Sequence, residues 1–204
     1  MSEDSSTANA SRSALQRMLH RHPIPLVLSF EGMLAVVALL LALAFGLRPW
    51  NELEISVSVL VLTLAATLPM VLALDLLGRV RWNWVQEIAD AIRVALLPLF
   101  RNAPPGALVA VALMAGIGEE LLFRGVIQAA LEGWLGPLAG LLLASLLFGL
   151  AHFVTVGYLV LACLMGLYFG LLYQWTGNLL VPILVHALYD WVALRWYLRR
   201  YPDD

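Results

Sequence analysis

The chain of 204 residues consists mainly of long apolar runs, separated by short breaks that carry charges, glycine or proline. Each run has roughly the 20 residues that an α-helix needs to cross the hydrocarbon core of a bilayer. The pattern therefore predicts an all-α fold, a polytopic membrane helix bundle with about six transmembrane helices. The predicted spans are 26–47, 55–77, 107–131, 137–155, 158–175 and 179–197.

The segment 78–105, between the second and third spans, is broken by charges but keeps a helical period of apolar residues. These apolar positions are Val85, Ile88, Ile92, Leu96 and Leu99, and they follow Trp82 and Trp84. A helix with one apolar face and aromatic residues at its start is typical of a segment that lies in the membrane interface. We therefore expect one interfacial amphipathic helix here.

The beginning of the chain is polar and small, with five serines in residues 1–14. Such a composition cannot bury enough apolar surface to fold. We expect residues 1–22 to form a disordered cytoplasmic N-terminal tail and residues 23–204 to form a single transmembrane domain. A cleaved signal peptide fits the first span less well, because its apolar core has only about 7 to 15 residues.

The composition supports the membrane interpretation and excludes some functions. Hydrophobic residues make up 62% of the chain and charged residues 13%, whereas soluble domains average about 45 to 50% and about 25%. With a net charge of −2 and no large basic surface, nucleic acid is not an expected partner, and the lipid bilayer is. The single cysteine, Cys163, excludes an intrachain disulfide.

Arginine sets the expected orientation, because the chain has twelve arginines and no lysine. In a six-span arrangement with the N-terminus inside, all of them except Arg48 and Arg124 lie on the cytoplasmic side, as the positive-inside rule requires. Both termini are therefore predicted to be cytoplasmic. The lack of lysine points to a GC-rich bacterial genome, so the predicted location is the bacterial inner membrane.

Three charges lie inside the third span, where a charged side chain costs roughly 2.5 to 3.5 kcal/mol on insertion scales. Glu120 and Arg124 are four residues apart on one helix face, so we expect an ion pair between them. Glu119 is rotated by about 100° and stays available for proton transfer. The alternative is a wholly structural charge cluster.

Histidine and aspartate occur in two later spans. His152 lies in the fourth span, and His186 and Asp190 lie four residues apart on one face of the sixth. A lone histidine in an apolar helix is more often a packing residue. Taken together with Glu119, however, these side chains are a credible catalytic or metal site.

The charged and histidine-containing segments resemble a known family, the CPBP intramembrane proteases, which include the CAAX prenyl endopeptidases and the Abi bacteriocin-immunity proteins. The three matching motifs, in order, are Glu119-Glu120-x-x-x-Arg124, Phe148-x-x-x-His152 and His186-x-x-x-Asp190. Each motif is weak alone, but three in this order on separate apolar spans are a strong signal. The protease-like core would cover residues 107–197.

The resemblance implies an intramembrane endopeptidase of the glutamic type, without a cofactor, that acts on a membrane-associated peptide or protein. Glu119 would be the general base, and His152 would help to hold the attacking water. His186 and Asp190 would polarise the scissile carbonyl and stabilise the oxyanion. The supporting structural residues would be Glu120, Arg124 and Phe148.

Asp190 departs from one branch of the family, which has asparagine at this position. An ionised aspartate cannot donate a hydrogen bond to an oxyanion. Either Asp190 stays protonated, or it orients His186 by accepting the ring N–H, and we favour the second alternative.

Three other functions stay open at this point. A zinc-dependent protease would use Glu119, His152, His186 and Asp190 as ligands, but the H-E-x-x-H signature is absent. A proton or cation transporter also uses buried carboxylates and histidines, and a non-catalytic immunity or scaffold protein could keep them for stability. Candidate substrates of a protease are bacteriocin-like leader peptides and C-terminal membrane anchors.

The predicted boundaries leave one mismatch. Glu119 lies about 18 Å from the cytoplasmic edge of its span and His152 only about 5 Å, at 1.5 Å per residue. We therefore expect the fourth span to run deeper, or the site to lie nearer the cytoplasmic side, than these boundaries indicate.

Overall fold

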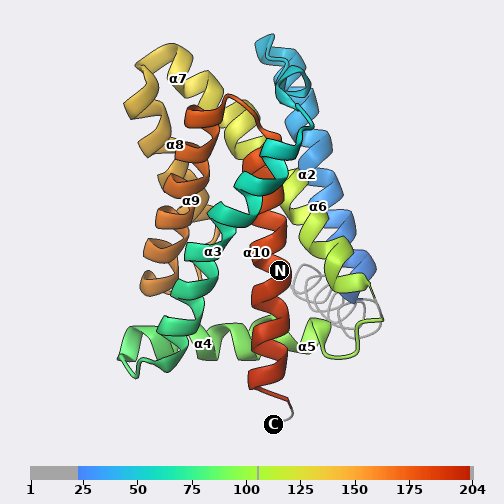
Figure 1. The fold of residues 1–204 in the computed structure, drawn as a ribbon, viewed down its shortest axis with the longest axis vertical. Coiled ribbons are helices and arrows are strands. Elements are labelled where there is room, and N and C mark those ends of the chain that lie inside the picture. The colour runs from blue at the N-terminus through green and yellow to red at the C-terminus, as the bar shows by residue number, and fades with distance from the viewer. Residues whose placement is uncertain (1–22, 105, 203–204) are drawn as a thin grey trace, which may run out of the picture.

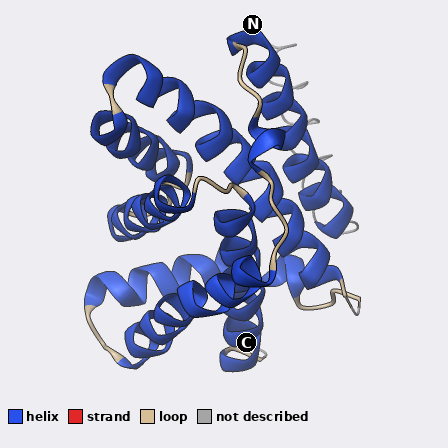
Figure 2. Ribbon diagram, turned by 45° about the horizontal axis from the view of Figure 1, so that its top comes forward, coloured by secondary structure: helices blue, strands red, loops and turns tan. Residues whose placement is uncertain are grey.

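The computed structural model describes residues 23–104 and 106–202, and every regular element in these ranges is a helix (Figures 1 and 2). The longest helices run roughly along the long axis of the molecule (Figure 1). In chain order they are α2 (Pro23–Phe45), α3 (Val57–Arg79), α6 (Ala107–Leu122), α8 (Pro137–Ala151), α9 (Val156–Thr176) and α10 (Leu180–Arg200). The predicted all-α helix bundle is confirmed.

The third predicted span is a continuous helical rod in three parts. It begins as α6, widens into the π-helix η2 (Phe123–Gln128) and ends as α7 (Ala129–Leu135). Single π turns inside α-helices occur frequently at functional sites. Here the π turn begins directly after the segment that carries both glutamates of the third span and contains Arg124.

Within the described residues, α2, α3 and α9 are long and apolar enough to cross a membrane by length and composition, and α8 is a shorter apolar helix. The other two predicted spans are helical as well. The π-helix divides one of them, and α10 carries charged side chains, among them Asp190 and Arg195. Large apolar side chains such as Leu40, Leu43 and Leu64 are more than 60% exposed, as expected for residues that face lipid.

The segment between the second and third spans forms α4 (Asn83–Ala95) and α5 (Leu97–Phe100), which lie across one end of the bundle (Figure 1). Val85 and Ile88 are buried on one face of α4, while Glu87 and Asp90 on the other are exposed. The predicted amphipathic helix is therefore present. The start of α2 and the end of α10 lie at this same end; its assignment to the cytoplasm stays a prediction, and the predicted 1–22 tail lies outside the described residues.

Two glycines let α6 pack closely against two different helices. A Cβ atom at Gly116 would lie 2.7 Å from the carbonyl oxygen of Ile183 in α10, and one at Gly118 would lie 2.5 Å from that of Glu31 in α2. Real Cβ atoms do not approach backbone oxygen this closely. The two glycines therefore fix the distance of α6 from α10 on one face and from α2 on another.

The short connection between α2 and α3 is fastened to the α9–α10 turn at the other end of the bundle. It contains the 3₁₀-helix η1 (Pro49–Glu52), where Glu52 accepts a hydrogen bond from the hydroxyl of Tyr173. Asn178 donates its side-chain amide to the carbonyl of Glu54 over 2.8 Å. These contacts hold the N-terminal helix pair against the motif-bearing helices.

Candidate active site

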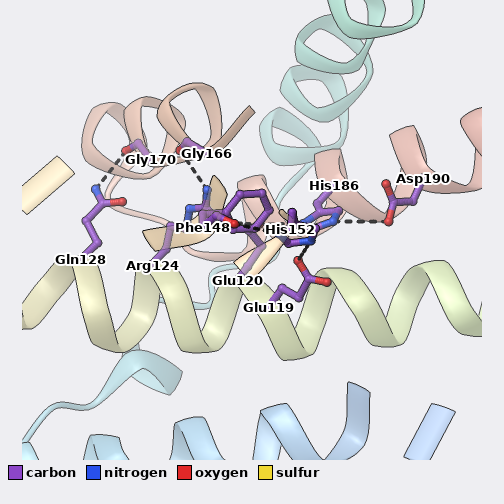
Figure 3. Close-up of polar contacts among 10 residues, drawn as sticks. All are labelled: Glu119, Glu120, Arg124, Gln128, Phe148, His152, Gly166, Gly170, His186 and Asp190. Atoms are coloured by element: carbon purple, nitrogen blue, oxygen red, sulfur yellow. Dashed lines mark hydrogen bonds and ion pairs between the residues drawn. The ribbon is translucent and has the colours of Figure 1, made fainter. Parts of the chain in front are cut away.

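Glu120 and Arg124 form the buried ion pair that their spacing predicts. Their side chains are 0% and 1% exposed, and Nη1 of Arg124 lies 2.8 Å from Oε1 of Glu120 (Figure 3). The other terminal nitrogen of the guanidinium donates to the carbonyl of Gly166 in α9 over 2.9 Å. The guanidinium carbon also lies 4.5 Å from the ring centroid of Phe148 and 5.3 Å from that of Phe169. The pair therefore ties α6 to α8 and α9.

Glu120 has a second partner that sequence spacing does not indicate. Nδ1 of His186 lies 2.7 Å from Oε1 of Glu120, and Nε2 of the same ring lies 3.4 Å from Oδ2 of Asp190. A carboxylate oxygen only accepts, so Nδ1 is the donor toward Glu120. The ring also stacks on Phe169 at 4.9 Å between centroids, and the residue is 3% exposed.

Both ring nitrogens of His186 thus face carboxylate oxygens. This geometry agrees with the alternative in which Asp190 orients the imidazole rather than donating to an oxyanion. It does not match a histidine whose N–H points freely at a substrate carbonyl. A direct contact of His186 with substrate would require Asp190 to move away from Nε2.

Glu119 contacts a different histidine. Its Oε2 lies 3.3 Å from Nε2 of His152 (Figure 3). Nδ1 of His152 lies 2.8 Å from the carbonyl oxygen of Phe148. Because that carbonyl can only accept, Nδ1 carries a hydrogen and Nε2 is the nitrogen left for Glu119. The pair can therefore share one proton between a carboxylate oxygen and Nε2.

The position of His152 corrects one predicted boundary. α8 ends at Ala151, and His152 is its C-cap, whereas the sequence placed the end of the fourth span at residue 155. The histidine at the helix end still reaches Glu119, which lies in the second half of α6. The two residues meet at the end of α8, where the ring of Phe148 packs against that of Phe123 in η2 at 5.0 Å between centroids.

A cavity of about 590 Å³ lies in front of this pair, a volume usual for a small-molecule or peptide site. Glu119, His152 and Asp190 line it, together with apolar side chains of α3, α4, α9 and α10. Of the four predicted catalytic residues, His186 alone is not among the described residues that line the cavity. Its Nε2 contacts Asp190, which does line the cavity.

Glu31 in α2 also lines the cavity and is a residue that the sequence interpretation missed. It is 8% exposed, and its Oε2 has no hydrogen-bond partner among the described residues. Glu31 lies within the apolar run 26–47, and a lone carboxylate within a span is a signal of function. The same reasoning that selected Glu119 could have found it.

The residues of the zinc alternative do not fit a metal centre. Among the described residues, no group of three or more histidine, cysteine, aspartate or glutamate side chains converges in a way that could hold an ion. The four candidate donors instead contact one another in two separate sets. One is Glu119 with His152, and the other is His186 between Glu120 and Asp190.

Residues 101–192 match the family model described as Rce1-like, type II CAAX prenyl endopeptidase. The match confirms the resemblance to CPBP proteases over a segment that contains all three motifs and excludes α2. The uncharacterized protein YpbD of Bacillus subtilis (strain 168) is 35% identical over 81 residues, which are 38% of this chain and 39% of that protein. The match thus spans about two fifths of that relative. No solved structure gives a significant match.

Proposed function

We propose, from the Rce1-like match of residues 101–192, that this chain is an intramembrane endopeptidase that hydrolyses a peptide bond in a membrane-associated peptide or protein. The observation that carries this proposal is the cavity whose polar wall presents Glu119 and His152 in contact. The neighbouring Glu120 is 0% exposed and is not among the described residues that line this cavity, and its Oε1 is held by both Arg124 and His186. One glutamate of the pair is therefore free to act on a water, and the other is not.

The proposed mechanism uses these residues without a metal. A water beside the Glu119–His152 pair attacks the scissile carbonyl, and its proton passes to the Glu119 carboxylate. His152 stabilises the charge of Glu119 through Nε2, since its other nitrogen is held by the carbonyl of Phe148. General-base catalysis of this kind contributes about 10² to 10⁴-fold in rate.

His186 and Asp190 take a supporting part in this proposal. Asp190 lines the cavity and holds Nε2 of His186, while Glu120 holds Nδ1. The ring is thereby fixed behind the cavity wall, where its N–H dipoles and any positive charge act on the oxyanion through a short, water-poor distance. A rotation of Asp190 would turn this support into a direct hydrogen bond.

The test compares cells that carry the wild-type gene, Glu119→Gln or the control Glu87→Gln, a glutamate on the exposed face of α4. Quantitative proteomics of membrane fractions is expected to show an uncleaved membrane precursor only in the Glu119→Gln cells. Its cleaved product should be present in the wild type and the control. An identical set of membrane peptides in all three strains, with equal amounts of each variant in the membrane, would contradict the protease proposal.

The same comparison separates the protease from a scaffold or a transporter. A scaffold keeps its phenotype in the Glu119→Gln cells, because the substitution leaves the surface of the protein unchanged. A transporter is tested by ion flux into proteoliposomes that contain the purified wild type. The proposal requires cleavage of the identified precursor by the purified wild type and no cleavage by Glu119→Gln.

A further inference from the structure

Glu31 is a buried carboxyl group that the mechanism above does not use. It lies in the first half of α2, on the helix face that packs against α6 at Gly118, the residue directly before Glu119. Its side chain lines the same cavity as Glu119, His152 and Asp190. It interacts electrostatically with Glu119 of α6, His152 of α8, and His186 and Asp190 of α10.

The surroundings of Glu31 differ from those of Glu119 in one decisive way. Oε2 is buried and without a hydrogen-bond partner among the described residues in both glutamates. In Glu119, however, this oxygen lies 3.3 Å from Nε2 of His152, whereas no such cationic partner contacts Glu31 among the described residues. Buried charges in proteins are paired, and an unpaired carboxylate beside further carboxylates takes up a proton instead. Two carboxyl groups held in such different environments are the usual arrangement of an acid and a base.

We propose that Glu31 is the acid of this site, the carboxyl group that carries a proton in the resting protein and gives it to the leaving nitrogen. The inference rests on the proposed peptidase function. Water loses a proton to Glu119 as its oxygen bonds to the carbonyl carbon. The carbon–nitrogen bond then breaks, and the nitrogen takes the proton of Glu31. Transfer of the proton from Glu119 to Glu31 through the cavity restores both groups.

A purely structural role does not explain this carboxyl group. The close contact between α2 and α6 is made by the backbone of Glu31 and by Gly118, so an apolar side chain at position 31 would serve the packing equally well. The carboxyl oxygen Oε2 adds a desolvation cost without a compensating bond in the described residues. This desolvation cost is explained if the hydrogen-bond partner of the Glu31 carboxyl group is the substrate, which is present only during the reaction.

The first test needs no substrate. Infrared spectra of the purified full-length protein are recorded in neutral buffer for the wild type, Glu31→Gln and the control Glu87→Gln. The C=O stretching band of a protonated carboxyl group is expected in the wild type and the control and should be missing in Glu31→Gln. A wild type without this band, or a Glu31→Gln protein that keeps it at full intensity, would overturn the proposal.

The second test uses two versions of the peptide that the precursor experiment identifies, one with an amide and one with an ester at the scissile position. An ester leaving group depends much less on a proton donor than an amine does. Glu31→Gln should lower kcat for the amide by about 10² to 10⁴-fold with little change in KM, and lower kcat for the ester far less. Glu119→Gln should lower both.

The outcomes distinguish the two proposals. If Glu31→Gln cleaves the amide at the wild-type rate while Glu119→Gln is inactive, Glu31 is not the acid and the peptidase proposal stands. If Glu31→Gln loses the ester and the amide activity equally, its effect is structural and the inference also fails. If Glu119→Gln cleaves normally, the peptidase mechanism itself is wrong, while the infrared spectra still report on the proton of Glu31.

Discussion

The two adjacent glutamates of α6 should respond in opposite ways to the same substitution. Glu120 is 0% exposed and carries the only close carboxylate contact among the described residues to Arg124, at 2.8 Å, as well as the bond from His186 at 2.7 Å. Glu119 lines a cavity and contacts His152 at 3.3 Å. Glu119→Gln and Glu120→Gln have the same size and chemistry, so each variant is the matched control of the other.

The expected magnitudes follow from what each substitution leaves behind. Glu120→Gln leaves the buried guanidinium of Arg124 without its counterion, and removing one partner of a buried pair costs about 3 to 5 kcal/mol. Glu119→Gln removes a carboxylate from a cavity that Asp190 also lines, so the lost attraction to His152 is offset by reduced repulsion between Glu119 and Asp190. Its free energy of unfolding should stay within about 1 kcal/mol of the wild type.

Unfolding of the purified variants in mixed detergent micelles, followed by circular dichroism as the fraction of a denaturing detergent rises, measures the difference. Cleavage of the identified precursor is measured on the same samples. We expect Glu119→Gln to be stable and inactive, and Glu120→Gln to be clearly destabilised. Equal destabilisation of the two variants, or a stable Glu120→Gln, would refute the assignment of separate structural and catalytic tasks.

Three further outcomes are expected. Gly118→Ala should lower the free energy of unfolding by about 1 to 3 kcal/mol, because the added Cβ would lie 2.5 Å from the carbonyl oxygen of Glu31. At Gly133 an added Cβ meets no atom within 4 Å, so Gly133→Ala should stabilise α7 by about 0.5 to 1 kcal/mol. Thermal unfolding of the two variants measures the difference. Zinc chelators should leave the cleavage rate unchanged, and stoichiometric zinc in active protein would contradict this. Asp190→Asn should cleave about tenfold faster than Asp190→Ala, since its amide oxygen still accepts from His186; equal rates would argue against this contact.

Sequence periodicity predicted the contacts that lie within one helix. The Glu120–Arg124 pair and the His186–Asp190 contact both join residues four apart, and both are present. Such contacts follow from the 3.6-residue turn alone. The helical spans and the amphipathic helix were predictable for the same reason, because burial against lipid or against the bundle leaves a local pattern.

Contacts between helices were not predictable in this way. The bond from His186 to Glu120 joins α10 to α6, and its existence depends on how closely those helices approach. The sequence therefore predicts His186 at the substrate, whereas in the structure His186 is not among the described residues that line the cavity. Glu31 was missed for a different reason, since a single carboxylate hardly lowers the average hydropathy of α2 and the motif comparison does not extend to that helix.

The helical positions of α6 explain how neighbouring carboxylates can differ so strongly. Gly116 and Glu120, four apart, face α10, where the glycine lets the helices come close enough for His186 to reach the carboxylate. The stripe of Val111, Ala115 and Glu119 faces the cavity instead. Gly118 faces α2 and brings the backbone of Glu31 against α6. Consecutive residues of a helix are rotated by about 100°. Within one turn of α6, Glu120 therefore points toward α10, Glu119 toward the cavity, and Gly118 toward the backbone of Glu31 in α2.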